Sequence, residues 1–312
     1  MESEHIIGRY EGEEEGPLFI CTAGMHGNEP AGVLALKSVV HLLEREPLIN
    51  PGFKYRGCML ALLGNTRAYL NGKQRFIAKD LNRLWEPETV QRIRQTLPEQ
   101  LEAEELELSE LISVIDGEIA ACKPQRIVLL DLHSTSATGG IFSIATEAPE
   151  SVRIALELHA PVITGMMNGI KGTTLHYFTK NNFPCPAVGV AFEGGQHDDH
   201  LTVNRCIAAI INCMRSIGAV RPEDVENHHD ELLIQFSKDL PKIAGLIHVH
   251  SIKQDDKFKM HIGYQNFQAV RKGEILGKDR HGIIRSPADS LILMPLYQPQ
   301  GSDGFFLIKK TA

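Results

Sequence analysis

A histidine and a glutamate three residues apart are the first side chains in this sequence that could do chemistry together. His26 and Glu29 lie in the glycine-flanked segment GMHGNE at 24–29, directly after the apolar run at 18–21. An imidazole and a carboxylate on a turn that leaves a buried strand can both bind one cation such as Zn²⁺. Because a catalytic zinc usually has three protein ligands and keeps one position for water, the pair predicts a third, distant ligand.

The best candidate for that third ligand is His133, near the end of the run IVLLDLHS at 127–134. A continuous apolar run is typical of a strand buried on both faces, and alternation along a strand places Asp131 and His133 on the same side. Catalytic groups collect at the carboxyl ends of strands in open α/β sheets. Asp131 either orients the imidazole or only lies beside it. A histidine at a strand end can also be an ordinary residue, so the metal site is a hypothesis.

A lone carboxylate, Glu193, ends another apolar run, AVGVAFEGG at 187–195. Burying a charged side chain costs free energy, so a buried glutamate is expected to have a function. Glu193 is therefore a candidate general base that takes a proton from metal-activated water. The alternative is that it caps the helix predicted from about Val203 to Ile217. His197 and His200 compete as metal ligands, but no strand end positions them, and we expect exposed-loop or helix-capping roles for both.

A stretch rich in arginine and amide side chains follows the second apolar strand, which is predicted at 56–65. Its arginines include Arg67, Arg75 and Arg83. A guanidinium group can bind a carboxylate through two bonds or stabilise an oxyanion, although an arginine in a loop is more often simply solvated. The next segment, 88–122, has many acids with leucine and isoleucine at helical spacing, which predicts surface helices whose charged face is solvated. We assign that segment no chemistry.

Length and element order indicate the fold class. The 312-residue chain is 43% hydrophobic and 23% charged, as is ordinary for a soluble protein, and is long enough for one large and one smaller domain. Predicted strands alternate with helices, the first of which begins at Pro30, so we predict an α/β fold with a mixed sheet flanked by helices. After about residue 225, short strands separated by glycine-containing turns predict a smaller, mainly β domain. The predicted domains are 1–224 and 225–312.

Charge and composition restrict the partners. The formal charge of −7 gives no reason to expect nucleic acid or an anionic membrane, and we expect a small-molecule substrate. The N-terminus is acidic and lacks the features of a signal peptide, and no apolar run approaches a membrane span, so we expect a cytoplasmic protein. Six scattered cysteines without a CxxC pair favour reduced core thiols over disulfides or a thiolate zinc site. The composition is compatible with a homo-oligomer.

Four motifs resemble, in this order, those of the succinylglutamate desuccinylase/aspartoacylase family, relatives of the zinc carboxypeptidases. They are GMHGNE at 24–29, DLNR at 80–83, DLHS at 131–134 and VAFEGG at 190–195, and they span about 170 residues. The resemblance implies a zinc-carboxypeptidase-like α/β fold with a smaller β domain. It also implies one zinc ion per chain, held by His26, Glu29 and His133, and hydrolysis of the amide bond of an N-acyl amino acid by metal-activated water.

The resemblance also implies roles for residues around the metal. Glu193 would be the general acid/base, and Arg75, seven residues before Asn82 as in aspartoacylases, would polarise the scissile carbonyl. Asn82 and Arg83 would hold a substrate carboxylate. Where aspartoacylases have a further arginine shortly before the catalytic glutamate, this chain offers only Lys180, so the acyl group and the amino acid are not specified.

Two rival functions stay open. The first is a zinc carboxypeptidase that acts on short peptides, which would use the same ligands and the same base. The second is a non-catalytic module that keeps the metal or only the fold. Retention of the whole predicted ligand set together with Glu193 favours an enzyme.

Overall fold

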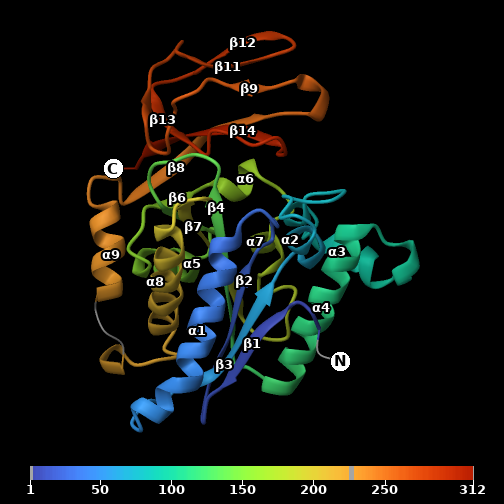
Figure 1. The fold of residues 1–312 in the computed structure, drawn as a ribbon, viewed down its shortest axis with the longest axis vertical. Helices are drawn as coiled ribbons and strands as arrows, with labels where there is room; N and C mark the ends of the chain where they lie inside the picture. The colour runs from blue at the N-terminus through green and yellow to red at the C-terminus, as the bar shows by residue number, and fades with distance from the viewer. Residues whose placement is uncertain (1–2, 225–227, 312) are drawn as a thin grey trace.

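The protein is described here by a computed structural model, which covers residues 3–224 and 228–311 and confirms the predicted α/β fold (Figure 1). The strands are β1 Ile6–Glu11, β2 Glu14–Ala23, β3 Arg56–Leu63, β4 Ile127–Thr135, β5 Phe142–Ala145, β6 Val162–Thr164, β7 Ala187–Gln196, β8 Ile243–Ser251, β9 Lys259–Met260, β10 Ala269–Val270, β11 Ile275–Asp279, β12 Gly282–Arg285, β13 Ser290–Leu293 and β14 Asp303–Lys310. In the described part of the chain they form a mixed eleven-stranded sheet, in the order β1-β3-β2-β4-β7-β5-β6-β8-β14-β13-β10, and a three-stranded sheet, β12-β11-β9.

Helices cover both faces of the large sheet. Their bounds are α1 Pro30–Ile49, α2 Thr66–Leu70, α3 Pro87–Arg94, α4 Ala103–Cys122, α5 Pro149–Glu157, α6 Met166–Gly169, α7 Thr174–Tyr177, α8 Leu201–Ser216 and α9 His228–Ser237, with the short 3-10 turns η1 Leu81–Arg83, η2 Pro98–Gln100, η3 Pro222–Asp224 and η4 Gln254–Asp256. The helices α1, α5, α8 and α9 pack on one face, and α3, α4 and α7 pack on the other (Figure 1). None of the described helices has both the length and the apolar character needed to span a bilayer.

Side chains of the central strands alternate between two apolar cores. In β2, Phe19 and Cys21 belong to the core under α1 and α8, whereas Leu18 and Ile20 belong to the core under α4. This double burial is why the strand reads as a continuous apolar run in the sequence. The first helix begins at Pro30, where a fixed φ and a missing N–H group cost nothing.

The register of three parallel strands brings the predicted site together. In the pairing of β2 with β4, Ala23 lies opposite Leu132, so the turn after β2 lies beside the carboxyl end of β4. In the pairing of β4 with β7, His133 lies directly opposite Glu193. The polar residues that end these strands therefore share one edge of the sheet.

The C-terminal part is rich in β-strands, as predicted, but its strands continue the large sheet. Strand β8 pairs in parallel with β6 and antiparallel with β14, and β13 and β10 follow at the edge. Strands β9, β11 and β12 form the small sheet beside it. The predicted boundary between 224 and 225 borders the residues 225–227, which lie outside the described residues, and the division into two domains stays a prediction.

The acidic helix α4 differs from the expectation of a solvated charged face. Glu104, Glu105 and Glu107 are buried rather than exposed. The carboxylate of Glu107 accepts hydrogen bonds from Thr66 Oγ1 at 2.7 Å and from the backbone N–H of Thr66 at 2.9 Å, and it pairs with Arg67. The prediction was wrong for these three glutamates, because helical spacing does not reveal partners that come from another part of the chain.

Cysteine usage also differs from the expectation. Cys58 in β3 and Cys122 at the end of α4 form a disulfide, so the prediction of reduced thiols is wrong for this pair. The two residues are 64 positions apart and belong to no recognisable spacing pattern, and the packing of α4 over β3 brings them together. The remaining cysteines, Cys21, Cys185, Cys206 and Cys213, are free.

We expect Cys122→Ser to lower the free energy of unfolding by about 2–4 kcal/mol, because the unfolded chain loses a cross-link that restricts its conformations. Urea unfolding followed by circular dichroism measures the change. The matched control is Cys185→Ser, which replaces a free, half-buried cysteine. Equal stability of Cys122→Ser and the unsubstituted protein, with and without a reductant, would show that the disulfide does not contribute.

Candidate active site

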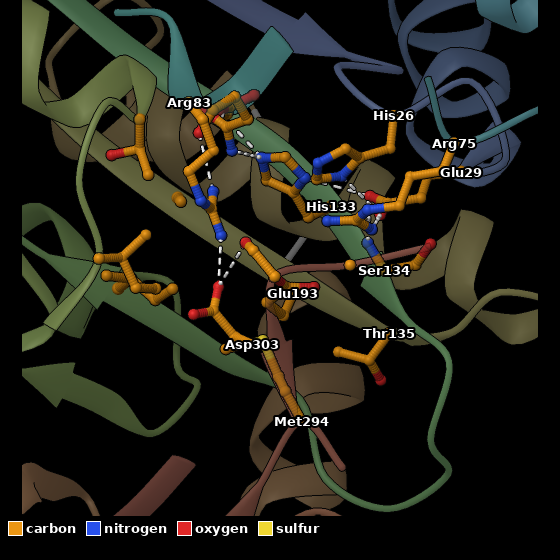
Figure 2. A pocket seen from close by; sticks show the side chains of 18 of the residues that line it. His26, Glu29, Arg75, Arg83, His133, Ser134, Thr135, Glu193, Met294 and Asp303 are labelled. Carbon is orange, nitrogen blue, oxygen red and sulfur yellow. Dashed lines mark hydrogen bonds and ion pairs between the residues drawn. The ribbon is translucent and has the colours of Figure 1, made fainter. Parts of the chain in front are cut away.

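The three predicted metal ligands meet at the edge of the sheet (Figure 2). His26 Nδ1 lies 2.8 Å from one carboxylate oxygen of Glu29, and His133 Nδ1 lies 3.1 Å from the other. All three side chains are buried, and one potential ligand atom of each lies within 4.8 Å of the other two. The turn after β2 and the end of β4 thus supply one compact donor set of two nitrogens and a carboxylate.

A glycine lets a second loop lie against the ligand turn. The N–H of Gly27 donates to the carbonyl oxygen of Arg75 at 3.1 Å. A Cβ atom at position 27 would come within 2.4 Å of the backbone of Ala68 and of Gln74. Only glycine allows this approach, so the turn that holds His26 also positions the loop that carries Arg75.

Each imidazole is held at its other nitrogen by an aspartate. His26 Nε2 lies 3.0 Å from Asp80 Oδ1, and His133 Nε2 lies 3.0 Å from Asp131 Oδ2. Asp131 is itself fixed by the hydroxyl groups of Thr22 at 2.7 Å and Thr174 at 2.6 Å. The sequence left open whether Asp131 contacts the imidazole ring of His133 or only lies beside it. In the structure its carboxylate contacts the ring. Such carboxylates orient metal-binding histidines and set their tautomers.

The donor set fits a divalent cation. A neutral imidazole has only one N–H, yet each of the two rings faces a carboxylate oxygen at both nitrogens. Burial lowers the pKa of His133, but Asp131 and Glu29 outweigh it and hold that pKa well above its usual range. The site therefore requires added positive charge, supplied either by protons or by a metal. Two imidazole nitrogens and one carboxylate form a common donor set for catalytic zinc.

Glu193 lies beside the ligand cluster on β7. It is 7% exposed, and its Oε2 has no hydrogen-bond partner among the described residues. Burial raises the pKa of Glu193 to about 7. It does not cap α8, whose N-cap position is occupied by His200. A carboxyl group with a pKa near neutrality can both accept and return a proton, which general acid–base catalysis requires.

Arg75 lies next to the ligand cluster and is mostly buried (Figure 2). Its Nη1 lies 3.4 Å from Glu29 and its Nη2 lies 3.4 Å from Asp80, both at the long end of a hydrogen bond. The buried Nε has no partner within the described part of the chain. The guanidinium group thus retains donors that face the site. Arg67, in contrast, pairs with Glu107 and Glu110 outside the cavity.

The loop that carries Arg75 is anchored by a buried carboxylate of α4. Glu104 accepts three backbone N–H bonds from consecutive residues, Ile77 at 2.6 Å, Ala78 at 3.0 Å and Lys79 at 3.0 Å. Because three donors converge on one carboxylate, the loop between Arg75 and Asp80 has little freedom.

Asn82 and Arg83 line the same cavity as the ligand cluster. Asn82 Nδ2 lies 3.4 Å from His133 Nε2, and its Oδ1 accepts the N–H of Thr174 at 3.1 Å. Arg83 Nη1 donates to the carbonyl oxygen of Asn82 at 2.8 Å. Its Nη2 donates to Asp303 at 2.6 Å. The arginine fork is therefore already paired with a carboxylate from the C-terminal part.

Other predicted residues have different positions. Lys180 is exposed and is not among the residues that line the cavity, so the structure does not bring it to the site. His197 is half-buried, with Nδ1 2.8 Å from Ser134 Oγ, and the prediction of an exposed or capping role is wrong for it. His200 is 90% exposed and makes no side-chain cap bond.

Two aspartates of the site were not given roles from the sequence. Asp80 directly precedes the LNR triplet, so its place in that motif was an available signal. Asp303 offered none, because it contacts Arg83 across 220 residues of sequence. Only the pairing of β14 with β8, which extends the large sheet, places it near the cavity.

Comparisons of the sequence with known proteins match one family. Residues 15–215 match a family model described as the succinylglutamate desuccinylase/aspartoacylase catalytic domain. A probable aspartoacylase from Nostoc sp. is 34% identical over 118 residues, which is 38% of this chain and 35% of that protein. A succinylglutamate desuccinylase from Pseudomonas putida is 27% identical over 282 residues, covering 86% of this chain and 75% of the relative.

Solved structures share the fold at low sequence identity. The succinylglutamate desuccinylase from Vibrio cholerae superposes with a TM-score of 0.62 at 17% identity, over 96% of this chain and 82% of that one. A succinylglutamate desuccinylase/aspartoacylase from Rhodobacter sphaeroides gives a TM-score of 0.64 at 15% identity, over 96% and 87% of the two chains. At these identities the likeness concerns the fold alone.

We expect Glu104→Gln to loosen the loop that positions Arg75, because an amide offers one acceptor oxygen where three backbone N–H groups now bind a carboxylate. Hydrogen exchange at residues 77–79 should become faster, and the free energy of unfolding should fall by about 1–3 kcal/mol. Glu99→Gln, at an exposed glutamate, is the control. Unchanged exchange at these amides would contradict the anchoring role of Glu104.

Proposed function

The chain belongs to the succinylglutamate desuccinylase/aspartoacylase family, and we propose that it is a zinc-dependent deacylase that hydrolyses the amide bond of an N-acyl amino acid. Membership of the family supports a deacylase. The observation that carries the proposal is the meeting of His26, Glu29 and His133 in one buried cluster directly beside Glu193. A structural site has no need of an unpartnered buried carboxylate next to its ligands, whereas a hydrolytic site does.

His26, Glu29 and His133 would hold one zinc ion. A bound zinc ion lowers the pKa of water and polarises a carbonyl group. Glu193 acts as the general acid/base: its carboxylate accepts the proton of the attacking water and later gives that proton to the departing amine. Burial raises the pKa of Glu193 above its usual range, which favours an exchange of the proton in both directions. Asp80 and Asp131 hold the two imidazole rings in place throughout.

The remaining polar residues bind and orient the substrate. Arg75 donates a hydrogen bond to the scissile carbonyl oxygen and stabilises its developing negative charge. Asn82 and the free donors of Arg83 bind the α-carboxylate of the amino acid. Because these residues are buried or tied to neighbours, the substrate meets a preorganised site.

We expect zinc-loaded Glu193→Gln to retain its metal and to lose hydrolysis of N-acetyl amino acids by a factor of about 10²–10⁴, because the amide cannot move the proton. An assay of released amino acid over a panel of N-acetyl and N-succinyl amino acids measures this. Glu88→Gln, at an exposed glutamate, is the control. Activity of the variant within about tenfold of the parent would exclude the role of Glu193. Turnover of dipeptides alone would favour a carboxypeptidase.

Metal content tests the ligand set independently of turnover. The protein purified without chelator should contain about one zinc per chain by plasma mass spectrometry, and His26→Ala should contain almost none, because two ligands do not make a tight site. His200→Ala is the matched control, because this histidine is 90% exposed and is not among the residues that line the cavity. Equal zinc in His26→Ala and the parent would contradict the ligand assignment.

A further inference from the structure

Arg83, expected to bind a substrate carboxylate, already has a carboxylate partner from the protein itself. Figure 2 shows the side chain of Asp303, the first residue of β14, pointing to the guanidinium group of Arg83, and the two groups lie 2.6 Å apart. Both line the cavity, where the side chains are only 25% and 13% exposed. At this depth the pair is shielded from bulk solvent, so the charge of Arg83 is largely neutralised before any substrate arrives.

The other arginine of the cavity is also paired with acids. Arg75 faces Glu29 and Asp80. Among the described residues that line the cavity, four have carboxyl groups and two have guanidinium groups, and no lysine is present. Even with a divalent cation bound to the ligand cluster, the lining has no unpaired positive charge for a second substrate carboxylate.

Part of the cavity wall is apolar, and the remainder has hydroxyl and amide side chains. Met167 lies in α6 and Ile170 directly follows it, while Met294, Leu296 and Phe306 come from the C-terminal strands and the loop between them. Burial of aliphatic or aromatic substrate surface against this wall is favourable, whereas a carboxylate placed there would lose its hydration without a partner.

We propose that Asp303 makes the site selective for N-acyl amino acids that have a single carboxylate and an uncharged, apolar side chain. The α-carboxylate binds Asn82 and the hydrogen-bond donors that Arg83 retains. An arginine has five such donors, and Asn82 and Asp303 engage two of them. A side-chain carboxylate, as in aspartate or glutamate derivatives, meets the like charge of Asp303. This inference rests on the proposed function and names the substrate class of the same site.

An acid in the cavity could instead select a substrate that has a cationic side chain. Asp303 does not favour it, because its carboxylate is already occupied by Arg83 and by the hydroxyl group of Ser302 at 3.3 Å. The other acids of the lining already have tasks, because Glu29 and Asp131 contact the two histidines and Glu193 is assigned the proton transfer. An uncharged side chain therefore fits the site better than a charged one of either sign.

Binding by calorimetry to zinc-loaded Glu193→Gln tests the inference without any dependence on turnover. N-acetylasparagine and N-acetylaspartate have the same shape and differ in one charge. We expect the amide to bind at least about tenfold more tightly than the acid, because like charges at short distance in a shielded site are strongly unfavourable. N-acetylleucine should bind at least as tightly as N-acetylasparagine.

The variant Asp303→Asn, made in the same background, removes the charge and keeps the shape. It should reduce the difference in affinity between N-acetylasparagine and N-acetylaspartate by a factor of about ten or reverse it, because Arg83 becomes free to bind the second carboxylate. The matched control is Asp255→Asn, which removes the acid of an exposed pair with Arg280 outside the cavity. That control should leave the difference unchanged.

Three results would overturn the proposal. They are equal or tighter binding of N-acetylaspartate while Asp303 is present, a difference that survives Asp303→Asn, and tightest binding of Nα-acetyllysine. The first and third need no substitution at Asp303, so they decide the matter even if that variant fails to fold. Absence of turnover of every N-acyl amino acid by the zinc-loaded parent protein would instead refute the proposed function, and the binding series separates the two failures.

Discussion

One buried carboxylate shared by two imidazole rings is the interaction on which the rest of the site depends. Glu29 contacts the Nδ1 atom of His26 with one oxygen and that of His133 with the other, at 2.8 and 3.1 Å. Burial alone would raise the pKa of Glu29, but the two histidines hold it well below its usual range, so the carboxylate stays ionised. These three polar side chains can be buried because each has hydrogen-bond or ion-pair partners. A cation bound among them would balance the charge of the carboxylates.

The sheet supplies the geometry that this cluster requires. Parallel strands end at the same edge, so the turn after β2, the end of β4 and the end of β7 become neighbours although they are far apart in sequence. The pairing of His133 with Glu193 fixes a ligand and a proton-transfer group on adjacent strands. Sites built on strand ends are positioned more rigidly than sites on free loops, which suits chemistry that needs a fixed distance between groups.

Carboxylates far from the ligand cluster shape the surroundings of the site. Glu104 binds three consecutive backbone N–H groups and so holds the loop that carries Arg75. Asp303 comes from the last strand and pairs with Arg83. In both cases an acid whose place in the sequence suggests the surface is itself buried or mostly buried, since Glu104 is 0% exposed and the side chain of Asp303 is 13% exposed. The large sheet links these contributions, since its C-terminal strands continue directly from the strands of the N-terminal part.

The α/β fold could be predicted from the amino-acid pattern, because buried parallel strands are continuous apolar runs and Pro30 marks a helix start. The same pattern predicted His26, Glu29, His133 and Glu193 as candidate site residues, since each ends or follows such a strand. The contacts of Glu104 and Asp303, the disulfide of Cys58 with Cys122, and the exposed position of Lys180 became known only from the folded chain. The physical reason is that local spacing reveals periodicity within an element, whereas the partner of a charge or a thiol depends on which distant elements pack together.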